Sequence, residues 1–215
     1  MKKEVFMLAL LLCAACQPRV QQQTVEEIEV EEPSYITLDE VDLSSVIRTT
    51  DSITYHTTVV YGGEHKPGDL VLSAVYGMDE FDSFGDKLLT PEVDVFQLTM
   101  HLKHKGATRP EKFVVVTDGK PHMLEPSMIQ KVARGEFMVL FNYGVMRMNS
   151  VPRDIAKSKS CQVKVRYNNG DAVYNVTDED KKAVATMFKS FIINGGTDYS
   201  SIDDIMEENR NKQKK

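Results

Sequence analysis

The chain has 215 residues, of which 41% are hydrophobic, and its formal net charge is −6 at pH 7. That length and apolar content suffice for one globular domain with a buried core and flanking tails. An acidic chain without a basic stripe interleaved with aromatic residues argues against nucleic-acid binding, so we expect no nucleic-acid partner.

The first sixteen residues have the three-part layout of a secretory signal. Lys2 and Lys3 come first, the apolar run Val5–Leu12 follows, and Ala14–Cys16 ends the segment with two small residues and a cysteine. This segment resembles the lipobox signal of bacterial lipoproteins. In that class the cysteine is lipidated and becomes the first residue of the mature protein. The alternative is an ordinary cleaved signal, whereas a membrane span would need about 20 apolar residues.

The resemblance implies that Cys16 is the lipidation site and that the protein is anchored in the membrane of the cell envelope. Gln17 follows the cysteine, in place of the Asp that favours inner-membrane retention in the lipoproteins of some diderm bacteria. The resemblance therefore implies the outer membrane, facing the periplasm or the cell surface.

Composition divides the chain into four parts. Residues 1–15 are the expected signal peptide, and 16–34 are the lipidated cysteine and a tether. The tether is rich in Glu and poor in apolar residues, which is typical of disorder, although a short edge strand over 27–32 is the alternative. One β-rich domain is expected over 35–196 and a charged flexible tail over 197–215.

Alternating apolar residues predict most of the strands. We expect strands over 53–61, 70–76, 96–103, 113–117 and from 137 to about 143, with Gly77 ending the second of them. The remaining segments are a short turn or helix over 41–46, a polar loop over 78–91, and short helices over 126–133 and 152–158.

The C-terminal part carries the clearest local signals. Asn169-Gly170 predicts a two-residue hairpin turn that sets Val165 opposite Tyr174. Thr177 can cap a helix that runs to about Ile193 and has one apolar stripe. The predicted fold class is therefore α+β: an antiparallel sandwich or curved sheet of about seven strands, with this helix packed on it.

Three cysteines are present, and Cys13 would leave with the signal while Cys16 takes the lipid. Cys161 alone remains, so no intramolecular disulfide is expected, and its alternation favours a buried thiol on a strand over a reactive one.

Chemical motifs are sparse. His101 and His104 have an odd separation on a predicted strand, so they should point to opposite faces and not share a metal. The acidic residues Asp79, Glu80, Asp82 and Asp86 lack the Gly and Asp/Asn spacing of a calcium loop. We therefore predict no catalytic residue, no metal ligand and no cofactor.

Three functional hypotheses remain. The first is a non-catalytic envelope lipoprotein that binds a protein partner or a small ligand. The second is a structural or assembly component whose strand edge or 78–91 loop docks a partner. The third is an envelope hydrolase, which would need carboxylates or His56 and His122 to converge.

Overall fold

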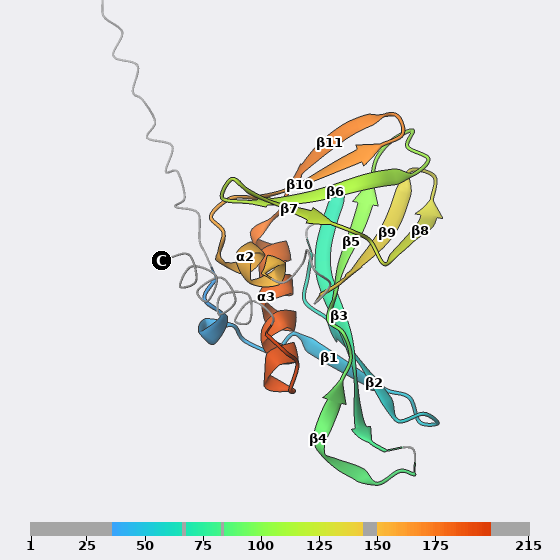
Figure 1. Ribbon diagram of the computed structural model, residues 1–215, viewed down its shortest axis with the longest axis vertical. Coiled ribbons are helices and arrows are strands. Elements are labelled where there is room, and N and C mark those ends of the chain that lie inside the picture. The colour runs from blue at the N-terminus through green and yellow to red at the C-terminus, as the bar shows by residue number, and fades with distance from the viewer. Residues whose placement is uncertain (1–35, 66–67, 83, 144–149, 199–215) are drawn as a thin grey trace, which may run out of the picture. The chain divides into compact units, whose positions relative to one another are not determined.

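The computed structural model describes residues 36–65, 68–82, 84–143 and 150–198. The strands among these residues form two antiparallel sheets, and the two α-helices described lie beside one face of the larger sheet (Figure 1). This architecture confirms the predicted α+β class.

The larger sheet, sheet A, has seven strands and the smaller, sheet B, has four. Sheet A consists of β1 (Val46–Thr50), β2 (His56–Tyr61), β3 (Leu70–Phe81), β4 (Lys87–Val93), β5 (Gln97–Lys103), β8 (Met128–Ala133) and β9 (Glu136–Asn142). Sheet B consists of β6 (Pro110–Thr117), β7 (Lys120–Leu124), β10 (Cys161–Tyr167) and β11 (Gly170–Asn175). The helices are the 3₁₀ turn η2 (Leu38–Glu40), α2 (Val151–Lys157) and α3 (Asp178–Ile193).

The chain passes between the sheets repeatedly. Sheet A runs in the order β1-β2-β3-β5-β9-β8, with β4 paired to the far half of β3, and sheet B runs β11-β10-β6-β7. Strands β5 and β9 are neighbours in sheet A. The strands β6 and β7, which lie between them in sequence, belong to sheet B. The expectation of about seven strands describes sheet A alone.

One face of sheet A is covered by two different layers. Towards the start of β3, Leu72, Met100 and Phe137 of sheet A pack with Val115 and Val163 of sheet B in one buried cluster. This contact between two sheet faces is that of a β-sandwich.

Helix α3 covers the rest of the same face. Tyr76 of β3 and Phe96, which directly precedes β5, pack against Phe188 and Phe191 of the helix in a second buried cluster. The Tyr76 hydroxyl lies 2.7 Å from Ser190 Oγ, so this buried polar group is hydrogen-bonded. The predicted apolar stripe of the C-terminal helix is thus confirmed.

The start of α3 is fixed to the sheet by Asp180. Thr177 and Asp180 form a capping box, as the predicted cap at Thr177 requires. The buried Asp180 carboxylate also accepts a hydrogen bond from the Leu72 backbone N–H, at 2.9 Å. Strand β2 pairs with β3 only from Val75 to Asp79, and Leu72 precedes this stretch. The Asp180 carboxylate therefore accepts the hydrogen bond that a neighbouring strand would accept.

Two segments differ from the sequence-based predictions. The polar loop expected over 78–91 is the end of β3 and most of β4, so Gly77 lies inside a strand and does not end one. The helix expected over 126–133 is the strand β8, whose residues are mostly exposed. Pairing with the buried β9 overrides the helix-like spacing of Met128, Ile129 and Val132.

The C-terminal hairpin forms, but its predicted register is wrong. Tyr167 pairs with Gly170 and Val165 with Ala172, so the turn residues are Asn168 and Asn169. Asn168 Oδ1 accepts hydrogen bonds from the backbone N–H groups of Thr108 and Arg109, at 3.0 and 3.4 Å, which holds Asn168 in the turn. A shift of two residues keeps the faces, so Val165 and Tyr174 still point to the same side.

Cys161 is buried at the start of β10, as predicted. Burial raises the pKa of its thiol to about 12, which leaves it uncharged at neutral pH. The segment with Cys16, the tether to residue 34 and the tail from 199 lie outside the described residues. In the part that is described, no helix has the length and apolarity needed to cross a membrane.

Candidate functional site

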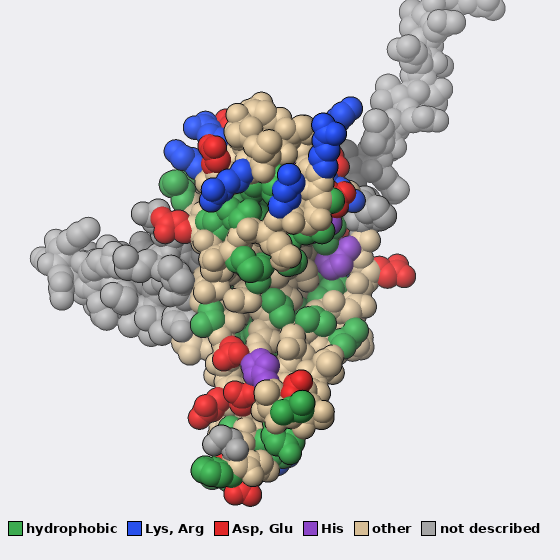
Figure 2. Space-filling model, turned by 90° about the vertical axis from the view of Figure 1, so that its right-hand side faces the viewer, with side chains coloured by type: hydrophobic (Ala, Val, Ile, Leu, Met, Phe, Trp, Pro, Cys, Tyr) green, Lys and Arg blue, Asp and Glu red, His purple; other side chains and the backbone are tan. Residues whose placement is uncertain are grey.

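In the part of the chain that the structure describes, neither sheet B nor a helix covers the second, open face of sheet A, and its side chains are half-exposed. Along β3 this face presents Val71, Ser73, Val75, Gly77 and Asp79, which alternate with the buried core positions. Figure 2 looks onto this side of the molecule.

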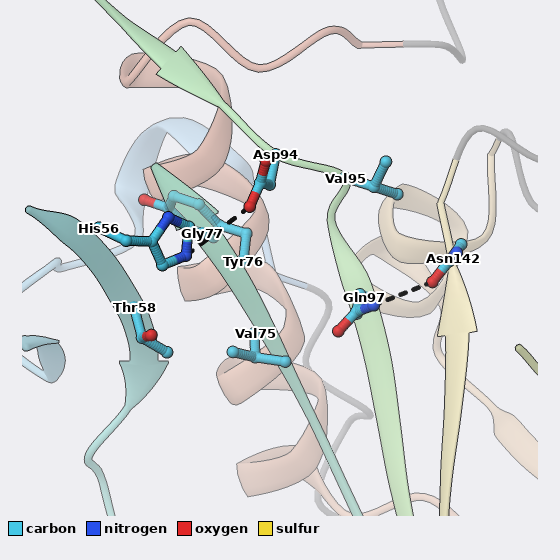
Figure 3. A pocket seen from close by; sticks show the side chains of 9 residues that line it. All are labelled: His56, Thr58, Val75, Tyr76, Gly77, Asp94, Val95, Gln97 and Asn142. Carbon is cyan, nitrogen blue, oxygen red and sulfur yellow. Dashed lines mark hydrogen bonds and ion pairs between the residues drawn. The ribbon is translucent and has the colours of Figure 1, made fainter. Parts of the chain in front are cut away.

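A hollow of about 390 Å³ lies on this open face, at the point where β4 gives way to β5. Figure 3 shows the side chains around it, which come from four segments that are distant in sequence. The lining residues are His56, Thr58, Val75, Tyr76, Gly77, Asp94, Val95, Gln97 and Asn142. We call this hollow the outer pocket.

One extra residue in the sheet shapes the outer pocket. Val75 pairs with Gln97 and Met78 with Val93, so the three residues 94–96 lie opposite the two residues 76 and 77. Such a bulge changes which face the following residues occupy. Asp94 and Val95 thereby stay on the open face, while Phe96 is fully buried in the core.

Gly77 makes the space for the polar groups. A Cβ at this position would lie 2.5 Å from Asp94 Oδ2 and 2.6 Å from the His56 ring. Any other residue would therefore displace one of these side chains. This close approach is a structural reason for a glycine inside a long strand.

His56 lies between two carboxylates. Its Nδ1 is 2.9 Å from Asp79 Oδ1, and its Nε2 is 3.7 Å from Asp94 Oδ2. His56 and Asp79 are direct partners across β2 and β3, and this register fixes the pair. A carboxylate on Nδ1 orients the ring and leaves Nε2 directed towards the pocket.

Two amides form the opposite wall. Gln97 Nε2 donates to Asn142 Oδ1 at 3.1 Å, between the neighbouring strands β5 and β9. The outer pocket is therefore lined by the Asp94 carboxylate and the His56 imidazole on one side and by the two amides on the other, with Asp79 behind the imidazole.

The other histidines and acidic residues lie apart from this pocket. His101 faces outward beside Glu136, at 3.9 Å, whereas His104 follows β5 and stacks on Tyr167 with ring centroids 4.4 Å apart. Glu80 lies 3.7 Å from Arg48, and Asp82 accepts hydrogen bonds within its own turn. In the part of the chain that is described, no cluster of three or more His, Cys, Asp and Glu has metal-holding geometry.

His56 and His122 belong to different sheets and form separate contacts. His122 in β7 is buried, with Nε2 2.9 Å from Thr117 Oγ1 and 3.3 Å from Asp154 Oδ2. Burial lowers the pKa of His122, so the neutral ring is favoured there. The two histidines do not form one site.

Comparison of the chain with family models, with curated proteins and with solved structures finds no match.

Proposed function

We propose that this chain is a lipid-anchored protein of the bacterial cell envelope. Its β-rich domain binds the cationic group of a partner or small ligand in the outer pocket and is not itself an enzyme. The anchor at Cys16 rests on the resemblance of the first sixteen residues to a lipobox signal. The binding role rests on the two carboxylates that flank His56: Asp79, its cross-strand partner, and Asp94, for which Gly77 leaves space.

Charge is the main support for a cationic ligand. None of the described residues that line the outer pocket is Lys or Arg. The segment 79–94, which forms this end of the sheet, contains six Asp and Glu residues and one Lys. An ammonium or guanidinium group is the complement of such a site, since it donates to carboxylate and amide oxygens together.

We expect N-acetyl-lysine methylamide and N-acetyl-arginine methylamide to bind with a dissociation constant on the order of 1 mM. Two charge-assisted hydrogen bonds of about 1.5–3 kcal/mol each correspond to that affinity. Nuclear magnetic resonance titration should show shifts at His56 and Gln97. Asp94→Asn should weaken binding by roughly tenfold.

Asp86→Asn is the matched control, because it removes the same charge from the exposed turn between β3 and β4, outside the pocket. It should leave the affinity unchanged. Equal weakening by both variants, or equal binding of N-acetyl-glutamate methylamide, would show general charge attraction and contradict the site.

The contact between His56 and Asp79 favours an envelope hydrolase as the second candidate, since an oriented imidazole can act as a general base. However, the group that His56 Nε2 faces is a carboxylate, not a hydroxyl or thiol. The binding role therefore has the better support. Turnover of an ester or amide probe that His56→Ala abolishes would reverse this order.

A structural role in assembly, through a strand edge, is the third candidate. The segment 78–91 would serve this role as a hairpin, since its residues lie in β3 and β4, which pair with each other.

For the anchor, Cys16→Ser should release the protein from membranes into the soluble envelope fraction. Without a cysteine at this position there is no thiol to carry the lipid. Fractionation of cells followed by detection of the chain measures the effect, and Cys13→Ser is the control that should stay membrane-bound. Retention of the Cys16→Ser protein would rule out lipidation at this residue.

A further inference from the structure

The end of sheet A opposite the outer pocket is basic, although the whole chain is acidic. Ranges 103–112, 131–136 and 164–171 contain eight Lys and Arg residues and three Asp and Glu residues. Strand register brings them together, since Lys103 pairs with Glu136 and Arg166 with Lys112. Figure 2 shows Lys and Arg side chains gathered at one end and mainly Asp and Glu at the other. We call these three ranges the basic end.

Most of this positive charge is not neutralised within the domain. Lys103 lies 3.8 Å from Glu136 Oε1, and Arg166 forms two hydrogen bonds with Asp171. For the other six cations, no ion-pair partner lies within 4 Å among the described residues. They are Lys105, Arg109, Lys112, Lys131, Arg134 and Lys164.

Exposed apolar side chains accompany these cations. Val173 is 58% exposed and lies opposite Lys164 in the register, and Val132, beside Lys131, is 55% exposed. Lys103, Lys105 and Arg134 line one hollow at this end, and Lys112, Lys164 and Arg166 line a second, so the cations are spread over both sheets. This spread suits an extended anionic surface better than a single small anion, and the apolar side chains suit its interface.

We propose that the basic end docks on the anionic headgroups of a lipid bilayer and so orients the domain on the membrane. This inference rests on the proposed function, because an anchor at Cys16 would hold the domain at a membrane. Screening acts over about 8 Å at physiological ionic strength, so the acidic end does not cancel the attraction. The acidic outer pocket would then face away from the membrane.

The test uses the chain from Gln17 to Lys215, which keeps every described residue and has no lipid-bearing cysteine. Its binding to phosphatidylcholine vesicles with roughly one-third phosphatidylglycerol is measured by co-sedimentation, beside vesicles of phosphatidylcholine alone. We expect binding to the anionic vesicles only, and a steep decrease with added salt.

Lys105→Glu with Arg134→Glu should weaken this binding by roughly tenfold or more, since each cation near an anionic surface contributes measurably. These two residues are neighbours, as a Cβ on Gly135 would lie 3.7 Å from Lys105 Cα. Lys157→Glu with Lys159→Glu is the matched control, with the same charge change at exposed positions beside the start of β10. Circular dichroism confirms that each variant is folded.

Equal binding to both vesicle types, or equal loss in both double variants, would overturn the proposal. Tighter binding to duplex DNA than to the anionic vesicles would also overturn it. The assay contains no lipidated residue, so a wrong anchor assignment would appear in the Cys16→Ser fractionation and not here.

Discussion

Phe96→Ala should lower the free energy of unfolding by about 3–5 kcal/mol, the usual cost of removing a buried phenyl ring. Phe96 is fully buried, and its ring lies 5.6 Å from Phe188 and 5.3 Å from Phe191, between centroids. Its loss would leave a cavity where α3 meets sheet A, because its neighbours are large rings that cannot easily move inward. Urea unfolding followed by circular dichroism measures the change.

Phe84→Ala is the control for this experiment. Phe84 is 90% exposed in the turn between β3 and β4, so the same substitution should change stability by less than about 0.5 kcal/mol. Similar losses in the two variants would mean that α3 does not pack on sheet A as described.

Asp180→Leu should cost about 3 kcal/mol of stability. The leucine cannot accept hydrogen bonds from the Leu72 N–H and from Thr177, and a buried N–H without an acceptor costs about 1–3 kcal/mol. Asp180→Asn keeps one acceptor oxygen and should cost about 1 kcal/mol. Thermal and urea unfolding distinguish the two variants.

Lys182→Leu places the same leucine on an exposed position of α3, two residues along the helix. Its effect should stay within about 0.5 kcal/mol. If Asp180→Leu were as stable as Lys182→Leu, the Asp180 carboxylate would have no part in joining helix and sheet.

The core-facing pattern of the central strands could be predicted from the sequence, because alternation shows which side is buried. It succeeded for β5, β9 and β10, where Leu98, Val139 and Val163 are fully buried. It failed for β4 and β8. These strands are largely exposed, so they have no buried face that would require apolar residues at every second position. For those strands the pairing partner determines the structure, and the partner is distant in sequence.

The outer pocket could not be predicted for a related reason. If residues alternated regularly before Phe96, Asp94 would share its buried side. The extra residue in 94–96 breaks this alternation, so Asp94 lies on the open face instead. His56, Asp79 and Asp94 come from β2, β3 and the end of β4, and only their register brings them together. Gly77 was the available signal, since a glycine within an apolar strand often marks a close approach.

The C-terminal position of α3 has a consequence for how the domain is made. Until the sixteen residues of α3 are present, Tyr76 and Phe96 lack the cover of Phe188 and Phe191. A chain that emerges amino end first would therefore keep part of sheet A unburied until synthesis or transport is nearly complete. Pairing of β5 with β9 across the intervening strands adds contacts between distant segments, which slow folding. Such a chain would complete this part of its core only when its final helix is available.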